Sequence, residues 1–151
     1  MTDALALPLD RAGIEAIIPH REPFLLVDEI VELVPGEHAV GRYHVAADAW
    51  YLRGHFPGRP IMPGVLQVEA LAQVGAVCGL SHPDFEGKLA LFAGIDDVRF
   101  KRIVTPGDVL TLDCRINRLR GPIGKADATA SVDGQLCCRA ALTFALTELD
   151  Q

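Results

Sequence analysis

The sequence lacks the excess of positive charge that nucleic-acid binding requires. Among its 151 residues, 14 are Lys or Arg and 20 are Asp or Glu, which gives a net charge of -6 at pH 7. Neutralising phosphate groups takes a dominant basic face. The composition therefore argues against a nucleic-acid partner, and an acidic partner would have to bind at a local basic patch.

A membrane span and a secretory signal are also missing from the sequence. The most apolar long segment, Gly64–Leu80, falls short of a bilayer span and contains Gln67, Glu69 and Gln73. Residues 1–10 carry no basic residue before their short apolar stretch, unlike a signal peptide. We therefore expect a cytoplasmic protein that does not cross a membrane.

Metal-binding patterns are absent as well. The cysteines form no CxxC pair and the histidines form no HExxH motif, so we expect no metal site. The cysteines are predicted to be small buried apolar residues: Cys78, Cys114, Cys137 and Cys138. Four histidines are predicted to be structural or exposed: His20, His38, His44 and His82.

Half of the residues are apolar, and the mean hydropathy is +0.24. A chain of this length buries one substantial core, so residues 1–151 are expected to form a single domain. A small domain as apolar as this one is expected to hide part of its surface against another subunit. We therefore predict a homo-oligomer.

Hydrophobic periodicity predicts an α+β fold. One long apolar helix, Gly64–Leu80, precedes a run of strands in which apolar and polar residues alternate. A short helix, Arg11–Ile18, is expected after Asp10 as its N-cap. The predicted strands are Leu25–Val34, His38–Val45, Leu89–Ile95, Val98–Val104, Leu110–Asn117, Ala126–Val132 and Leu136–Leu146, with a hairpin turn at Asp133–Gly134. This order suggests a curved antiparallel sheet wrapped around a central helix.

The segment before the long helix is rich in proline and glycine. Proline restricts the backbone and glycine permits conformations that other residues avoid, so the loop is predicted to be rigid. Pro63 suits the first helical position, which would leave the Gly64 and Val65 amides without intrahelical acceptors. With the helix dipole, those amides could polarise a carbonyl oxygen. An ordinary solvated helix start is the alternative.

Glu69 and His55 are the candidate catalytic residues. Glu69 lies inside the apolar helix, where a carboxylate needs a partner, and the sequence leaves a structural role and catalysis equally open. Gln73 follows one turn later and either orients Glu69 or bonds to backbone as a core amide. His55 lies in the rigid loop, and imidazole is the side chain best suited to proton transfer near neutral pH.

Several motifs in these segments resemble the FabZ-type 3-hydroxyacyl-[acyl carrier protein] dehydratases of type II fatty-acid synthesis. They run in the family's order from about residue 14 to about residue 147, and the stretch from His55 to Glu69 is the most specific. The motifs are Ile18-Pro19-His20-Arg21, Pro23-Phe24-Leu25-Leu26-Val27-Asp28, Gly54-His55-Phe56-Pro57-Gly58, Pro60-Ile61-Met62-Pro63-Gly64-Val65, Glu69-Ala70-Leu71-Ala72-Gln73, Phe92-Ala93-Gly94-Ile95-Asp96 with Arg99-Phe100, and Thr105-Pro106-Gly107-Asp108.

The resemblance implies a hot-dog fold whose sheet becomes continuous across a homodimer, often assembled further as a trimer of dimers. Each active site would lie at the dimer interface and would need neither a metal nor an organic cofactor. The partner would be acyl carrier protein bearing a 3-hydroxyacyl thioester. Glu22 stands where the family often has an aromatic residue.

The same resemblance assigns roles to individual residues. His55 would be the general base at substrate C2, Glu69 the acidic group that assists loss of the C3 hydroxyl, and Gly64 the backbone donor to the thioester carbonyl. Phe56, Val65 and Gln73 would complete the substrate-binding set.

The same residues are compatible with other functions. A hot-dog thioesterase could use a similar carboxylate to activate water, and a non-catalytic module could bind acyl thioesters. A related dehydratase also isomerises its product, but that family typically carries aspartate in place of Glu69. Arg99, Lys101 and Arg102 form the densest basic cluster, which is either a docking patch for acidic carrier protein or a solvated strand edge.

Overall fold

The computed structural model describes residues 6–148 as one long helix held in the concave face of a six-stranded antiparallel sheet. Residues 1–5, which open the segment inspected for a signal peptide, lie outside the described residues. The elements in chain order are α1 (Arg11–Glu15), β1 (Glu29–Val34), β2 (His38–His44), α2 (Gly64–Leu80), the 3-10 helix η1 (Pro83–Phe85), β3 (Leu89–Phe100), β4 (Val109–Arg120), β5 (Ile123–Val132) and β6 (Gln135–Thr147).

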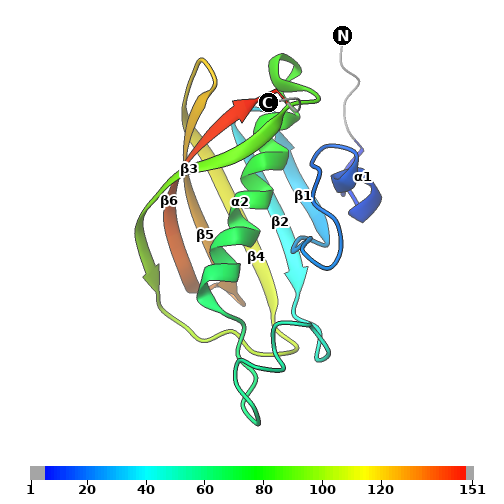
Figure 1. The fold of residues 1–151 in the computed structure, drawn as a ribbon, viewed down its shortest axis with the longest axis vertical. Coiled ribbons are helices and arrows are strands. Elements are labelled where there is room, and N and C mark those ends of the chain that lie inside the picture. The colour runs from blue at the N-terminus through cyan, green and yellow to red at the C-terminus, as the bar shows by residue number, and fades with distance from the viewer. Residues whose placement is uncertain (1–5, 149–151) are drawn as a thin grey trace.

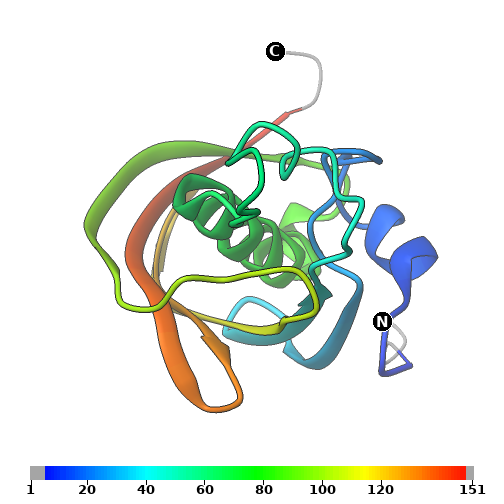
Figure 2. The same ribbon diagram turned by 90° about the horizontal axis from the view of Figure 1, so that it is seen from below.

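The strands lie in the order β1-β2-β4-β5-β6-β3, so that β1 and β3 form the two edges of the sheet. Figure 2 shows the sheet curving around α2. Bulges interrupt every ladder except the one between β2 and β4, and bulges bend and twist the strands that carry them. The predicted helix Gly64–Leu80 and the predicted sheet around it are both confirmed.

Buried apolar residues alternate with more exposed residues along β4, and this pattern explains how the sheet faces the helix. Leu110, Leu112, Cys114 and Ile116 are buried, as the sequence predicted, and the intervening side chains point away from the core. Small residues let α2 approach closely. A Cβ added to Gly41 on β2 would lie 2.9 Å from the Val74 side chain.

Two elements are shorter than their sequence patterns suggested. Helix α1 ends at Glu15 instead of Ile18, because the Arg21 guanidinium donates to the Glu15 and Ile18 carbonyls and closes the chain into a turn. Asp10 caps α1 as predicted, accepting a hydrogen bond from the Gly13 amide. Strand β1 begins only at Glu29, since the Leu26 amide donates to a helix side chain rather than to a neighbouring strand.

Two predicted strands are one in the structure. Strand β3 runs through Asp96 and Asp97, where the sequence suggested a break, and stays paired with β6 on both sides. Asp97 takes a positive φ of 53° in a bulge, which allows the strand to continue past a residue pair that disfavours regular strand.

A second bulge places both neighbouring cysteines in the core. Cys138 pairs with Ala130 and Leu136 pairs with Ser131, which leaves Cys137 as the extra residue. Adjacent strand residues normally face opposite sides, but Cys137 and Cys138 are both fully buried. All four cysteines are buried and free, as predicted. None of the described helices is long and apolar enough to cross a membrane.

Candidate active site

The loop between β2 and α2, which hangs below the start of α2 in Figure 1, is tied together by its own backbone. Phe56 and Arg59 exchange two backbone hydrogen bonds of 3.0 and 2.9 Å, and the Ile61 amide donates to the His55 carbonyl at 2.8 Å. The His55 and Phe56 rings stack with centroids 4.1 Å apart. The loop that the prolines and glycines predict to be rigid is therefore a compact turn with its own hydrogen bonds.

One hydrogen bond fixes the tautomer of His55. Its Nδ1 lies 2.8 Å from the Ile61 carbonyl oxygen, which can only accept, so Nδ1 carries the proton. In the neutral ring, Nε2 then keeps a free lone pair. The half-buried imidazole is thus held in the form that a general base requires.

Anchors outside the loop hold it against the domain. The Trp50 indole donates to the Pro23 carbonyl at 2.8 Å, and the Tyr51 and Tyr43 hydroxyls share a 2.8 Å hydrogen bond in the core. Burial raises the pKa of both phenols. At the far end, the Met62 amide donates to the Val104 carbonyl.

The start of α2 differs by one position from the prediction. Helix α2 begins at Gly64, and Pro63 is its N-cap rather than its first residue; the Pro63 carbonyl accepts from the Leu66 amide at 3.1 Å. Among residues 6–148, the Gly64 and Val65 amides find no hydrogen-bond acceptor.

Gly64 leaves room for the Phe100 ring, which would have to shift if position 64 carried a side chain. A Cβ there would lie 2.6 Å from the Phe100 ring, which covers the first turn of α2. The Val65 side chain is 72% exposed. A carbonyl oxygen approaching the helix start therefore meets backbone amides and apolar side chains.

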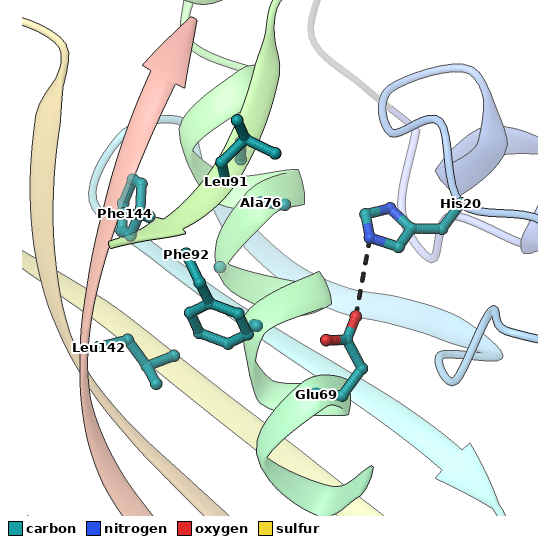
Figure 3. A pocket seen from close by; sticks show the side chains of 10 residues that line it. His20, Glu69, Ala76, Leu91, Phe92, Leu142 and Phe144 are labelled. Carbon is teal, nitrogen blue, oxygen red and sulfur yellow. Dashed lines mark ion pairs between the residues drawn. The ribbon is translucent and has the colours of Figure 1, made fainter. Parts of the chain in front are cut away.

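Glu69 projects from the second turn of α2 toward His20 (Figure 3). Its Oε2 lies 2.9 Å from the Gln73 side-chain nitrogen and 3.7 Å from His20 Nε2. Both side chains are largely covered, at 19% exposed for Glu69 and 22% for His20. Burial lowers the pKa of His20, an effect that outweighs the raising influence of Glu69 and is reinforced by Arg21.

Gln73 is fully buried and uses its whole amide. Its Oε1 accepts from the Leu26 amide at 2.7 Å, while its Nε2 donates to the Phe24 carbonyl and to Glu69. The sequence left two roles open for Gln73, orienting Glu69 or satisfying backbone. The structure shows both.

A cavity of about 60 Å³ opens beside Glu69. It runs over the small residues of α2 toward the inner face of β3 and β6 (Figure 3). Apart from His20 and Glu69 its walls are apolar, and they consist of Ala72, Gly75, Ala76, Ala90, Leu91, Phe92, Leu142 and Phe144.

The structure brings only part of the predicted site together within one chain. Gln73 and Glu69 are joined, but no hydrogen bond or ion pair among the described residues joins His55 to Glu69. His20 was not singled out by sequence patterns, since its partner Glu69 is far along the chain. The only sequence signal for it was the Ile18-Pro19-His20-Arg21 motif.

The three residues of the basic cluster lie in two different environments. Arg99 and Lys101 are exposed at the end of β3. Arg102 lies 3.3 Å from the Asp108 carboxylate and is partly covered. The acidic side chain of Asp108 also accepts from the Thr105 amide, so Arg102 belongs to the turn before β4.

Comparisons with known proteins agree with this architecture. The model of the FabA-like domain matches residues 18–141. In fold, the chain is similar to the dehydratase heterocomplex ApeI:P from Xenorhabdus doucetiae, with a TM-score of 0.77, coverage of 97% of this chain and 95% of that chain, and 19% identity. Fold and family model together define a FabA-like domain with the hot-dog fold.

More similar sequences narrow the assignment. The 3-hydroxyacyl-[acyl-carrier-protein] dehydratase FabZ of Chloroflexus aggregans is 61% identical over 135 residues, which cover 89% of this chain and 94% of the relative. The protein of the same name from Moorella thermoacetica is 53% identical over 140 residues, covering 93% and 98%. The chain therefore belongs to the FabZ family of dehydratases.

Proposed function

We propose that the chain removes water from (3R)-hydroxyacyl thioesters of acyl carrier protein to give trans-2-enoyl thioesters, with His55 and Glu69 as the catalytic pair. The family makes it a hydro-lyase of type II fatty-acid synthesis. The observation that supports the residue assignment best is the Glu69 carboxylate, locked by Gln73 at the mouth of an apolar cavity. The apolar walls can pack against an acyl tail, and the Glu69 carboxyl group can exchange a proton with the C3 hydroxyl.

The proposed reaction balances within these groups. The Gly64 amide donates to the thioester carbonyl and so acidifies the C2 hydrogen. His55 Nε2 takes that proton, and the electrons of the C2–H bond form the C2–C3 double bond. Glu69, protonated or through a donor water, gives a proton to the C3 hydroxyl, which leaves as water. Proton exchange with solvent then restores both groups.

A second copy of the chain is proposed to complete the site. Within one chain the cavity of about 60 Å³ is small against ligand pockets, which typically enclose about 300–1,000 Å³. Strand β3 is an edge of the sheet and exposes Leu91, Phe92 and Ile95, each at least 42% accessible. Pairing two such edges would cover this apolar surface and extend the sheet.

In that arrangement His55 of one chain would face Glu69 of its partner. Phe56 and Val65, both more than half exposed, would then line the substrate path. A trimer of dimers and a cytoplasmic location stay predictions from the sequence.

Carrier-protein docking is proposed at the basic end of β3. Arg99 and Lys101 are exposed and form no ion pair among residues 6–148, so they can bind acidic side chains, and Arg102 contributes by shaping the neighbouring turn. These residues follow the strand whose Phe100 covers Gly64, so the docked carrier would lie near the helix start.

The test follows two products of one reaction. The purified chain is incubated with a 3-hydroxyacyl carrier-protein thioester while enoyl thioester and free thiol are measured separately. Enoyl product without thiol is the expected result. Thiol release without enoyl product would identify a thioesterase instead, and the absence of both would point to a binding module.

A further inference from the structure

Phe144 closes the cavity at the end remote from Glu69. The residue lies on β6 and is 7% exposed, and its ring lies 3.6 Å from where a Cβ on Gly79 would be. Gly79 follows Glu69 by ten residues on α2, which corresponds to roughly 15 Å along the helix axis. Figure 3 likewise places Phe144 on the side of the cavity away from the carboxylate.

Small side chains leave the cavity open between Glu69 and Phe144. Ala72 and Ala76 follow Glu69 on the same face of α2, at helical spacings of three and seven residues. Leu91 and Leu142 form apolar walls on the sheet side. Among the described residues that line the cavity, only Glu69 and His20 are polar, so its natural occupant is a hydrocarbon chain.

Gly124 on β5 has no side chain, and this leaves room for the Phe144 ring. A Cβ on Gly124 would lie 2.4 Å from the ring, closer than real Cβ contacts come. Phe144 pairs with Gly124 of β5 on one side and with Phe92 of β3 on the other. Because the cavity lies on the β3 side, a methyl group at Gly124 would push the ring into it.

We infer that Phe144 determines the longest acyl tail that the enzyme accepts, with Gly124 setting the position of its ring. The inference rests on the proposed function, since the reacting C3 atom at Glu69 fixes where the tail begins. Within one chain the cavity encloses about 60 Å³, and Phe144 stands at the end toward which a longer tail would have to extend.

The test compares kcat/KM for 3-hydroxyacyl thioesters of four chain lengths: butyryl, hexanoyl, octanoyl and decanoyl. Phe144→Leu should raise the decanoyl-to-butyryl ratio by about tenfold, the lower end of what one methylene is worth in an apolar pocket. Gly124→Ala should lower it by a similar factor. A ratio does not depend on the fraction of active enzyme, so a partly unfolded variant still reports on length preference.

Two matched variants serve as controls. Gly79→Ala adds the same methyl group against the same ring, but at 3.6 Å, an ordinary contact, and should leave the ratio unchanged. Phe85→Leu removes a ring outside the cavity and should also leave it unchanged. Wild-type ratios in both Phe144→Leu and Gly124→Ala, with enoyl product still formed, would overturn the inference alone. No enoyl product from the wild type at any length would instead reject the proposed function.

Discussion

Gln73 holds Glu69 by a 2.9 Å hydrogen bond from an amide that two backbone groups have already oriented. The Leu26 amide donates to Gln73 Oε1 and the Phe24 carbonyl accepts from Nε2, so the nitrogen must face the carboxylate. The position of the proposed acid is therefore set by the segment before β1 as well as by its own helix.

Removing this amide should cost both stability and activity. Gln73→Leu leaves the buried Leu26 amide without a partner, a loss of about 1–3 kcal/mol in the free energy of unfolding, and removes the donor to the part-buried Phe24 carbonyl. It also frees Glu69 to turn, so kcat should fall. Urea unfolding and dehydration kinetics measure the two effects.

Gln67 provides the matched control for that substitution. It is a buried amide on the same helix, 3% exposed, whose Oε1 has no hydrogen-bond partner among the described residues. Gln67→Leu should be neutral or stabilising, because it removes a polar group that is already unsatisfied. Equal losses of stability in the Gln73 and Gln67 variants would contradict the assignment of Gln73.

Substitution of either proposed catalytic residue should abolish most turnover. His55→Ala and Glu69→Gln are each expected to lower kcat by about 10²–10⁴-fold, since each removes one acid–base group. Circular dichroism should show folded protein in both cases. Near-normal dehydration by either folded variant would remove that residue from the mechanism.

His20 should make stability depend on pH below its ordinary titration range. Its pKa is lowered in the folded protein by burial, against the raising influence of Glu69 and with the help of Arg21. The unfolded chain therefore binds a proton first as pH falls below about 6.5. The stabilising contribution of the neutral ring is present above that pH and is lost toward the lower pKa of the folded state.

Comparing urea midpoints at about pH 7 and about pH 5 tests this linkage. The decrease should be smaller for His20→Gln than for the wild type, because glutamine does not titrate. Carboxylates remote from His20 titrate alike in both proteins and cancel in the difference. An equal or steeper decrease in His20→Gln would show that His20 is not stabilised in its neutral form.

Charge reversal at the end of β3 should weaken binding of carrier protein. Arg99→Glu with Lys101→Glu is expected to raise the apparent KM for carrier-protein substrates by about tenfold at low salt, and less as salt rises. Short thioester mimics should be unaffected. The control is Arg118→Glu with Lys125→Glu, an exposed cross-strand pair on β4 and β5 that changes net charge equally. Similar effects of the two double variants would reject the docking surface.

Local patterns predicted the parts of the fold that local forces determine. Helix α2 was recognisable from its long apolar stretch, and the hairpin between β5 and β6 from Asp133-Gly134, whose φ values of 50° and 79° suit a two-residue turn. The end of α1 depends on Arg21, and the continuity of β3 past Asp97 depends on pairing with β6. Neither contact is visible in a sequence window.

The candidate site likewise combines residues that local patterns predict with contacts that only the fold creates. Glu69 and His55 stood out because a carboxylate in an apolar helix and a histidine in a rigid loop are unusual on local grounds. The contact between His20 and Glu69, and the closure of the cavity by Phe144, join residues far apart in the chain. Such relationships require the tertiary structure.

We propose that one active site takes His55 from one chain and Glu69 from another, and mixing two inactive variants tests this shared site most directly. His55→Ala and Glu69→Gln are unfolded together and reassembled. A mixed dimer gathers both lesions in one site and leaves the other site intact, so activity should return to roughly a quarter of wild type per site when subunits pair at random. No recovery in a mixture shown to contain mixed dimers would contradict the shared site.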